Sequence, residues 1–353
     1  MAIYILSEPY FDTSLWHQKI FNGLTHNLKK KKTDFLCITD ISHIKNSGKD
    51  YLYLLGTNIS WLNEKISTCR ALNINPIVLC AASNHDVIKG KYSIVCSDIK
   101  RSMNYILKSL SQNGKSRCAL YGINSSSILN VTQKEHFLNN KYIKASEEDV
   151  FYNKGSLNQC YDEFLKKAKC YDSIISVNDF ATVSLFKNLN ADAKNYMIAG
   201  YGGGFLSREY SSDIMLVSLN YEEFGKAAVS VCDIIRSNKE IETVDVYVKH
   251  SVFPEKADDK DIWDFERHPK PSVDDAFYND EETNRLLKTE KMFQHCDEMD
   301  YIILSLMSKD ISYEEIAESL FCSLNTVKYR VKKLKESCNC KSKAQLMGLI
   351  KFL

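Results

Sequence analysis

Short runs of β-branched and aromatic residues alternate with amphipathic stretches from residue 1 to about residue 253. The first of these runs predict strands at residues 3–6, 35–38, 51–55 and 76–80. Residues 15–30 place Trp16, Ile20 and Leu24 on one helical face, and residues 63–72 predict a second helix. Strands that alternate with helices indicate an α/β fold in which helices cover parallel sheets.

The alternation continues along the chain. Ser97 and Asp98 are expected to begin a helix that ends near Leu110. Further helices are predicted at 156–169 and 222–236, and further strands at 117–121, 173–177, 195–199, 214–219 and 244–253. With 353 residues, of which 44% are hydrophobic, the chain can bury a sizeable core.

Polar and aromatic residues follow several of the predicted strands. Ligands of open α/β sheets bind beyond the carboxyl ends of the strands, so we expect a small polar ligand there. The candidate ligand-binding residues are Phe11, Asp12, Trp16, Thr57, Asn58, Asn124, Gln133, Asn178, Asp179 and Tyr201. The alternative is that each of them caps a turn or a helix. The glycine-rich run at 200–204 lacks the spacing of a phosphate-binding loop.

The order of these segments resembles the periplasmic-binding-protein-like sensor domain of LacI/GalR-type repressors. The resemblance rests on Val95 and Asp98 before a helix, and on the segments 172–179 (DSIISVND), 196–201 (YMIAGY), 217–220 (VSLN) and 224–228 (FGKAA). It implies two similar lobes with a ligand cleft between them. Lobe 1 is expected from 1–96 and 218–241, and lobe 2 from 97–217 and 242–253. An arginine near Gln133 and an aspartate after Tyr201, usual in sugar-binding relatives, are missing here.

The last part of the chain has a different pattern, that of short capped helices. Ser312 and Glu315 form a capping-box sequence, and Ser342 with Gln345 repeats it. Ser323 is a further N-cap residue. The apolar residues Met299, Ile302, Ile303 and Leu306 recur at helical spacing. Residues 296–353 are therefore predicted to form a small all-α domain, after a linker and connecting helix at 254–295 with an acidic, proline-containing first half.

One predicted helix in this domain has two unlike faces. Val327, Val331 and Leu334 share an apolar face. Lysine and asparagine side chains, with Tyr329, form the opposite face, and such groups can contact DNA phosphates and base edges. The alternative is a solvated basic helix in a small bundle.

The same stretch resembles the LuxR/GerE-type helix-turn-helix domain. The matching motifs are Ile303-Leu304-x-Leu306, Ser312-x-x-Glu315-Ile316-Ala317-x-x-Leu320, Ser323-x-x-Thr326-Val327-Lys328 and Ser342-Lys343-x-Gln345. The sequence departs from the family at Met299, Asp310 and Lys343. The resemblance implies double-stranded DNA as a partner and a homodimer formed through Ala344, Met347 and Ile350. The expected DNA-binding residues are Ser323, Asn325, Thr326, Lys328, Tyr329, Arg330, Lys332 and Lys333.

Composition narrows the remaining functional classes. The net charge of +1 identifies no partner, and the twelve cysteines form no C-x-x-C pair, so no metal site or cofactor is predicted. No signal peptide or membrane-spanning run is recognised, which favours a cytoplasmic protein without a membrane partner. No catalytic constellation is present, so we expect no enzyme. A response regulator and a ligand-free regulator remain alternatives, although Ser7-Glu8-Pro9 lacks the acidic pair of a phosphate receiver.

Overall fold

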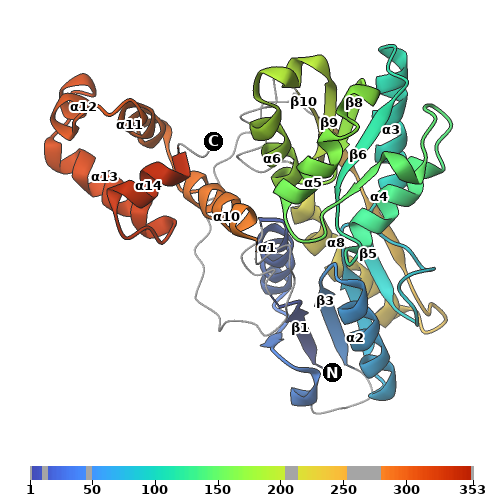
Figure 1. The fold of residues 1–353 in the computed structure, drawn as a ribbon. Coiled ribbons are helices and arrows are strands. Elements are labelled where there is room, and N and C mark those ends of the chain that lie inside the picture. The colour runs from blue at the N-terminus through green and yellow to red at the C-terminus, as the bar shows by residue number, and fades with distance from the viewer. Residues whose placement is uncertain (1, 10–14, 45–49, 203–213, 253–279, 351–353) are drawn as a thin grey trace.

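The structure is a computed structural model, and it describes residues 2–9, 15–44, 50–202, 214–252 and 280–350. Two α/β lobes and a set of C-terminal helices make up this described part (Figure 1). The expected α/β class, with two lobes of largely parallel sheets and a small all-α part, is confirmed. The described residues also contain four short 3-10 helices: η2 (Ile41–His43), η3 (Glu147–Asp149), η4 (Ala168–Cys170) and η5 (Asn190–Asn195).

Lobe 1 contains a six-stranded sheet in the order β11-β5-β4-β3-β1-β2, in which every pairing is parallel. Its strands are β1 (Ile3–Ser7), β2 (Leu36–Ile38), β3 (Tyr51–Leu55), β4 (Asn75–Leu79), β5 (Ser93–Ser97) and β11 (Asp245–Val248). Alternate residues of each strand point to opposite faces. Ile3 and Ile5 therefore pack under α1 (Leu15–Lys30) and α8 (Tyr221–Ser237), while Tyr4 and Leu6 pack in the core that α2 (Ile59–Ala71) covers.

Helices α1 and α8 cross at very short range. A Cβ atom added to Gly225 would lie 2.0 Å from the backbone nitrogen of Leu24, and one added to Gly23 would lie 2.3 Å from the carbonyl oxygen of Glu222. The crossing therefore requires glycine on both helices.

Lobe 2 contains the second six-stranded sheet, in the order β12-β10-β9-β8-β6-β7. Its pairings are parallel except that between β10 and β12. The strands are β6 (Cys118–Ile123), β7 (Val150–Tyr152), β8 (Ser173–Ser176), β9 (Met197–Tyr201), β10 (Ile214–Leu219) and β12 (His250–Val252). The covering helices are α3 (Ile99–Gln112), α4 (Ile128–Leu138), α5 (Leu157–Leu165) and α6 (Asp179–Leu189).

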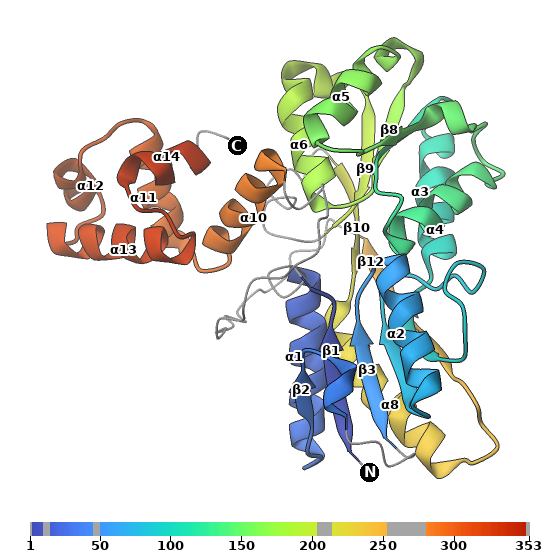
Figure 2. The ribbon, with the colours of Figure 1, turned by 60° about the horizontal axis from the view of Figure 1, so that its bottom comes forward.

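The described chain crosses between the lobes three times. It passes from β5 into α3, from β10 into α8, and from β11 into β12 (Figure 2). The third crossing lies between Val248 and His250, and the boundary expected near Glu242 is wrong. The reason is that β11 extends the lobe 1 sheet beside β5, where the Ser97 hydroxyl donates to the carbonyl of Val248 at 3.0 Å.

The C-terminal part consists of α10 (Glu281–Phe293), α11 (Glu298–Ser308), α12 (Tyr313–Ser319), α13 (Leu324–Ser337) and α14 (Lys343–Ile350). The predicted helix starts are confirmed. Ser312 and Glu315 form a capping box, Ser323 Oγ accepts from the amide of Thr326 at 3.1 Å, and Ser342 Oγ accepts from that of Gln345 at 3.1 Å. Residues 254–279 of the predicted linker lie outside the described residues.

Candidate nucleic-acid interface and inter-lobe site

Helix α13 separates its apolar and cationic residues as the sequence predicts. Val327, Val331 and Leu334 are at most 3% exposed and pack into the helical core. The opposite side carries exposed side chains, with Tyr329 69% exposed and the Lys332 side chain 71% exposed. The exposed members of the predicted DNA-binding set are Ser323, Asn325, Lys328, Tyr329, Lys332 and Lys333.

Two members of that set complete the cap of α13. The hydroxyls of Ser323 and Thr326 lie 2.9 Å apart, and Ser323 accepts the Thr326 amide. Phe321, two residues before Ser323, has a φ of +49°, and this left-handed conformation turns the chain sharply between α12 and α13; its side chain is 99% exposed. The cap therefore fixes where the exposed face of α13 begins.

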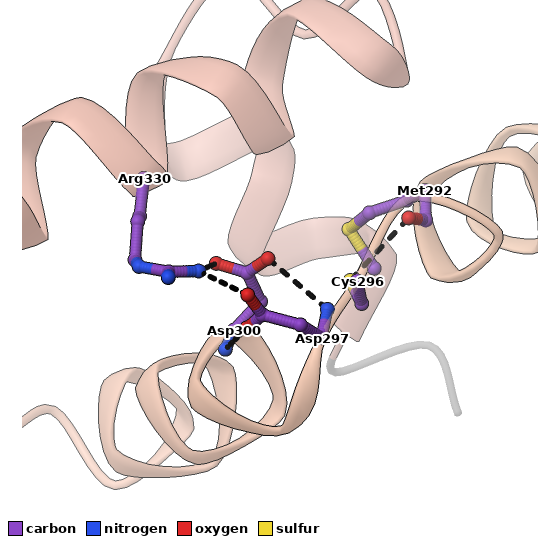
Figure 3. Close-up of polar contacts among 5 residues, drawn as sticks. All are labelled: Met292, Cys296, Asp297, Asp300 and Arg330. Atoms are coloured by element: carbon purple, nitrogen blue, oxygen red, sulfur yellow. Dashed lines mark hydrogen bonds and ion pairs between the residues drawn. The ribbon is translucent and has the colours of Figure 1, made fainter. Parts of the chain in front are cut away.

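Arg330 is held inside the domain (Figure 3). Its guanidinium donates to Asp297 at 2.7 Å and to Asp300 at 2.9 Å. These two aspartates form the capping box of α11, and the Asp300 side chain is only 3% exposed. Burial raises the pKa of Asp297, but Arg330 and backbone amides outweigh burial and hold that pKa below its ordinary value. Arg330 therefore joins α13 to the first turn of α11, rather than pointing freely to solvent with the lysines.

The junction between α10 and α11 lies beside this ion pair. Cys296 directs its thiol to the carbonyl of Met292 at 3.3 Å (Figure 3). Burial raises the pKa of Cys296 to about 12. This thiol is therefore a packing group at the helix junction.

Helix α14 buries more of its side chains within the helical domain than its expected role in a two-fold interface implies. Met347 is 8% exposed and belongs to the core, while Ile350 packs against it. Ala344 is exposed. Of the three residues expected at a two-fold interface, only Ala344 is freely presented to solvent.

Most of the described candidate ligand-binding residues fall, with their hydrogen-bonding partners, into three groups. The first is the loop between β3 and α2. Glu8, at the end of β1, accepts the amides of Thr57 at 2.6 Å and Asn58 at 2.9 Å through Oε2. The Asn58 side chain caps α2 by accepting from the amide of Trp61 at 3.0 Å. Glu8 is 8% exposed and was not recognised from the sequence, because a single glutamate after a strand matches no motif.

The second group is a chain of carboxamides in lobe 2. Asn130 accepts the amide of Asn124 at 3.0 Å and donates to Gln133 at 2.9 Å. Gln133 in turn donates to the carbonyl of Val177 at 3.2 Å, and it is fully buried. This chain joins the segments after β6 and β8, so Gln133 positions the candidate site from within the lobe.

The third group surrounds the start of α6. Asn178 caps that helix by accepting from the amide of Ala181 at 2.9 Å, and Asp179 is its first residue. Tyr221, which the sequence reading missed, lies beside Trp16 with ring centroids 6.4 Å apart. Burial and nearby Asp179 raise the pKa of Tyr221 above its ordinary value. Trp16 and Tyr221 therefore lie together, and Asp179 of lobe 2 is near enough to Tyr221 to influence its pKa.

The remaining candidates lie elsewhere. Tyr201 is 3% exposed, and its hydroxyl pairs with Ser102 of α3 at 3.0 Å inside lobe 2. Phe11 and Asp12 lie outside the described residues. Within the described part of the chain, no group of three or more His, Cys, Asp or Glu side chains could hold a metal ion. No helix among the described residues is long and apolar enough to cross a membrane.

Comparison with solved structures identifies the fold. The chain is similar to the transcriptional regulator CelR in its cellobiose complex, with 14% identity, a TM-score of 0.58, and coverage of 71% of this chain and 83% of that one. It is also similar to the transcription regulator CcpA of Lactococcus lactis, with 15% identity, a TM-score of 0.55, and coverage of 72% and 97%.

A solute-binding protein from Burkholderia graminis in complex with D-arabinose gives 10% identity, a TM-score of 0.57, and coverage of 72% and 94%. No protein-family model matches the chain, and no curated protein matches it. At these identities the similarity establishes the two-lobed, periplasmic-binding-protein-like fold. The resemblance to LacI-type sensor domains is therefore confirmed at the level of the fold.

Proposed function

We propose that this chain is a one-component, DNA-binding transcriptional regulator, in which a two-lobed sensor domain controls a C-terminal LuxR/GerE-type helix-turn-helix domain. The observation that carries the proposal is α13, a capped helix with an apolar buried face and an exposed face bearing Lys328, Lys332 and Lys333. Lysines neutralise phosphates, and Asn325 can pair with a base edge in the major groove.

Helix α10 supports a connection between the two parts of the chain. Near its start, Glu282 accepts from the Ser184 hydroxyl of α6 at 2.8 Å, and both residues are at most 5% exposed. Helix α10 also contacts α13 and α14, and its buried Leu286 and Met292 belong to the core cluster that lobe 2 and the C-terminal helices share. Because α6 begins at Asn178 and Asp179, a ligand at that end would act on the helix to which α10 is attached.

We further propose that the chain forms a homodimer, since helix-turn-helix proteins commonly read two half-sites about 34–36 Å apart. A regulator that binds DNA in this way is expected in the cytoplasm. A small, sugar-like effector acts by binding two arrangements of the lobes with different affinities. Two solved structures of similar fold are described in complex with cellobiose and with D-arabinose, which supports sugars as the first class to test.

The proposal is tested with the full chain and a pool of random duplex DNA. Repeated selection is expected to enrich one sequence motif, with two related half-sites if the protein binds as a dimer. A pool that stays random after selection would contradict sequence-specific DNA binding. A thermal-shift screen of sugars, amino sugars and nucleosides tests the effector separately, because a ligand of the folded state raises its apparent stability.

A ligand-free regulator is the second candidate. It is favoured by the internal partners of Thr57, Asn58, Asn124 and Gln133, whose polar groups are bound within the chain. The α/β domain would then serve dimerisation or protein partners. A receiver domain is not supported, because such a domain has a single five-stranded sheet, whereas the described part of this chain has two sheets of six strands.

A further inference from the structure

The two lobes are joined by backbone pairing away from the three crossovers. Asn58, before α2 of lobe 1, and Ser127, before α4 of lobe 2, form an antiparallel β-bridge. The amide of Ile59 donates to the carbonyl of Ser126 at 3.0 Å, and the amide of Ile128 donates to the carbonyl of Thr57 at 2.9 Å. Figure 2 shows α2 and α4 meeting end to end where the lobes adjoin.

One side chain reinforces this pairing. Ile128 is the first residue of α4 in lobe 2, yet it is fully buried in the lobe 1 core with Leu62 and Ile66 of α2. Burying an isoleucine stabilises a contact by about 1.5–3 kcal/mol. Lobe 1 also contributes side chains to the core of lobe 2, because Ala81 and Ala82 belong to that core cluster.

Polar contacts at and near the paired segments support this arrangement. Glu8 fixes the lobe 1 segment by accepting the amides of Thr57 and Asn58. Asn84 of lobe 1 donates to Glu135 of α4 at 2.9 Å. The carboxylate of Glu8 also lies at the N-terminus of α2, where the helix dipole favours negative charge.

We propose that these contacts form a latch, made of residues 57–59 and 126–128 with the Ile128 side chain, that keeps the lobes closed without an effector. The hydrogen-bonding groups of the latch belong to the chain itself, and so does the buried Ile128 side chain, which we call the plug. The latch engages the backbone carbonyl of Thr57 and the amides of Thr57 and Asn58, so these groups are not available to an effector. The latch itself does not depend on the DNA-binding proposal.

The amides of Ile59 and Ile128 provide a direct test. Each belongs to the first residue of a helix, where amides have no partner within the helix and ordinarily exchange freely with water. In the full-length wild-type protein without added ligand, residue-resolved hydrogen exchange is expected to show both amides protected by about ten-fold or more. Unprotected exchange at both positions would overturn the latch.

The variant Ile128→Ser tests the plug, and Ile99→Ser is its matched control. Ile99 is also the first residue of a helix and is 2% exposed, but it packs within the core of lobe 2. Ile128→Ser is expected to abolish the protection of the Ile59 amide, and Ile99→Ser to retain it. Equal loss in both variants would show that the protection reflects the overall stability of lobe 2, and the proposal would fail. If Ile128→Ser does not fold, the wild-type exchange decides the question.

Discussion

Replacing Arg330 by glutamine tests whether this residue holds α13 in position. The pair with Asp297 contributes little, about 0.2–1 kcal/mol, because the Asp297 side chain is 57% exposed. Asp300 is only 3% exposed, and breaking a fully buried ion pair costs about 3–5 kcal/mol. Since Arg330 is itself 26% exposed, water reduces this cost, and we expect a total loss of about 2–3 kcal/mol.

Native-state hydrogen exchange of the buried α13 residues in the full chain measures this loss locally. The amides of Val331 and Leu334 are expected to exchange about 30- to 140-fold faster in Arg330→Gln. Arg285→Gln is the matched control, because Arg285 forms an exposed ion pair with Glu281 one turn away. If Arg330→Gln accelerates exchange no more than Arg285→Gln, the positioning role is refuted.

The same variant has a predicted pH dependence. The pKa of Asp297 is lowered in the folded protein, so its contribution to stability is present above its ordinary pKa of about 3.9. That contribution is lost as the pH falls through the lowered value. The difference in unfolding free energy between the wild type and Arg330→Gln should therefore be constant from about pH 5 to 8, and it should become smaller as the pH falls towards 3.

Three further changes test other parts of the structure. Gly225→Ala should lower the melting temperature by forcing α1 and α8 apart, at a cost of about 1–3 kcal/mol, whereas Gly348→Ala, whose new methyl group meets nothing within 4 Å, should not. Burial raises the pKa of Glu282, although the Ser184 hydroxyl and the nearby cations Lys187 and Arg285 oppose this effect. The folded protein therefore loses stability as the pH rises through the raised pKa. Glu282→Gln should accordingly raise the melting temperature at pH 7 and remove this pH dependence; an unchanged profile would contradict it. A thiol reagent at pH 8 should modify exposed Cys170 in the native protein, and Cys118, whose pKa burial raises to about 12, only after unfolding.

Much of the architecture was predictable because periodic patterns determine which face of each element is buried. The alternation in β1 places Ile3 and Ile5 on one face and Tyr4 and Leu6 on the other. The caps at Ser312 and Ser323 predicted helix starts because their partners lie within three residues. Local chemistry of this kind is present in the sequence itself.

Features that depend on distant partners were not predictable. The stretch 244–253 reads as one strand, yet the structure divides it between two sheets, because β11 pairs with β5 and β12 with β10. Asn178 and Asp179 are candidate ligand-binding residues in the sequence, and only the structure shows that Asn178 caps α6 and that Asp179 is its first residue.

The candidate sites show the same limitation. Arg330 reads as one more cation among lysines, and only the fold places it against Asp297 and Asp300, 33 and 30 residues away. Ile128 begins a helix, α4, that was not predicted from the sequence, and only the meeting of the lobes places its side chain in the core of lobe 1. Residue type and spacing therefore predicted the exposed face of α13 better than the polar contacts between lobes.

The central claim, that α13 binds DNA through its lysines, is tested most directly by the salt dependence of DNA affinity. Fluorescence anisotropy with the selected duplex would compare the wild type with Lys328→Ala and Lys332→Ala. Lys226→Ala is the control, because Lys226 is, like Lys332, an exposed helical lysine beside a glutamate of the same helix. Each α13 variant is expected to bind more weakly and to reduce the slope of log K against log salt concentration by about 1. Affinities and slopes equal to those of the wild type and the control would contradict the claim.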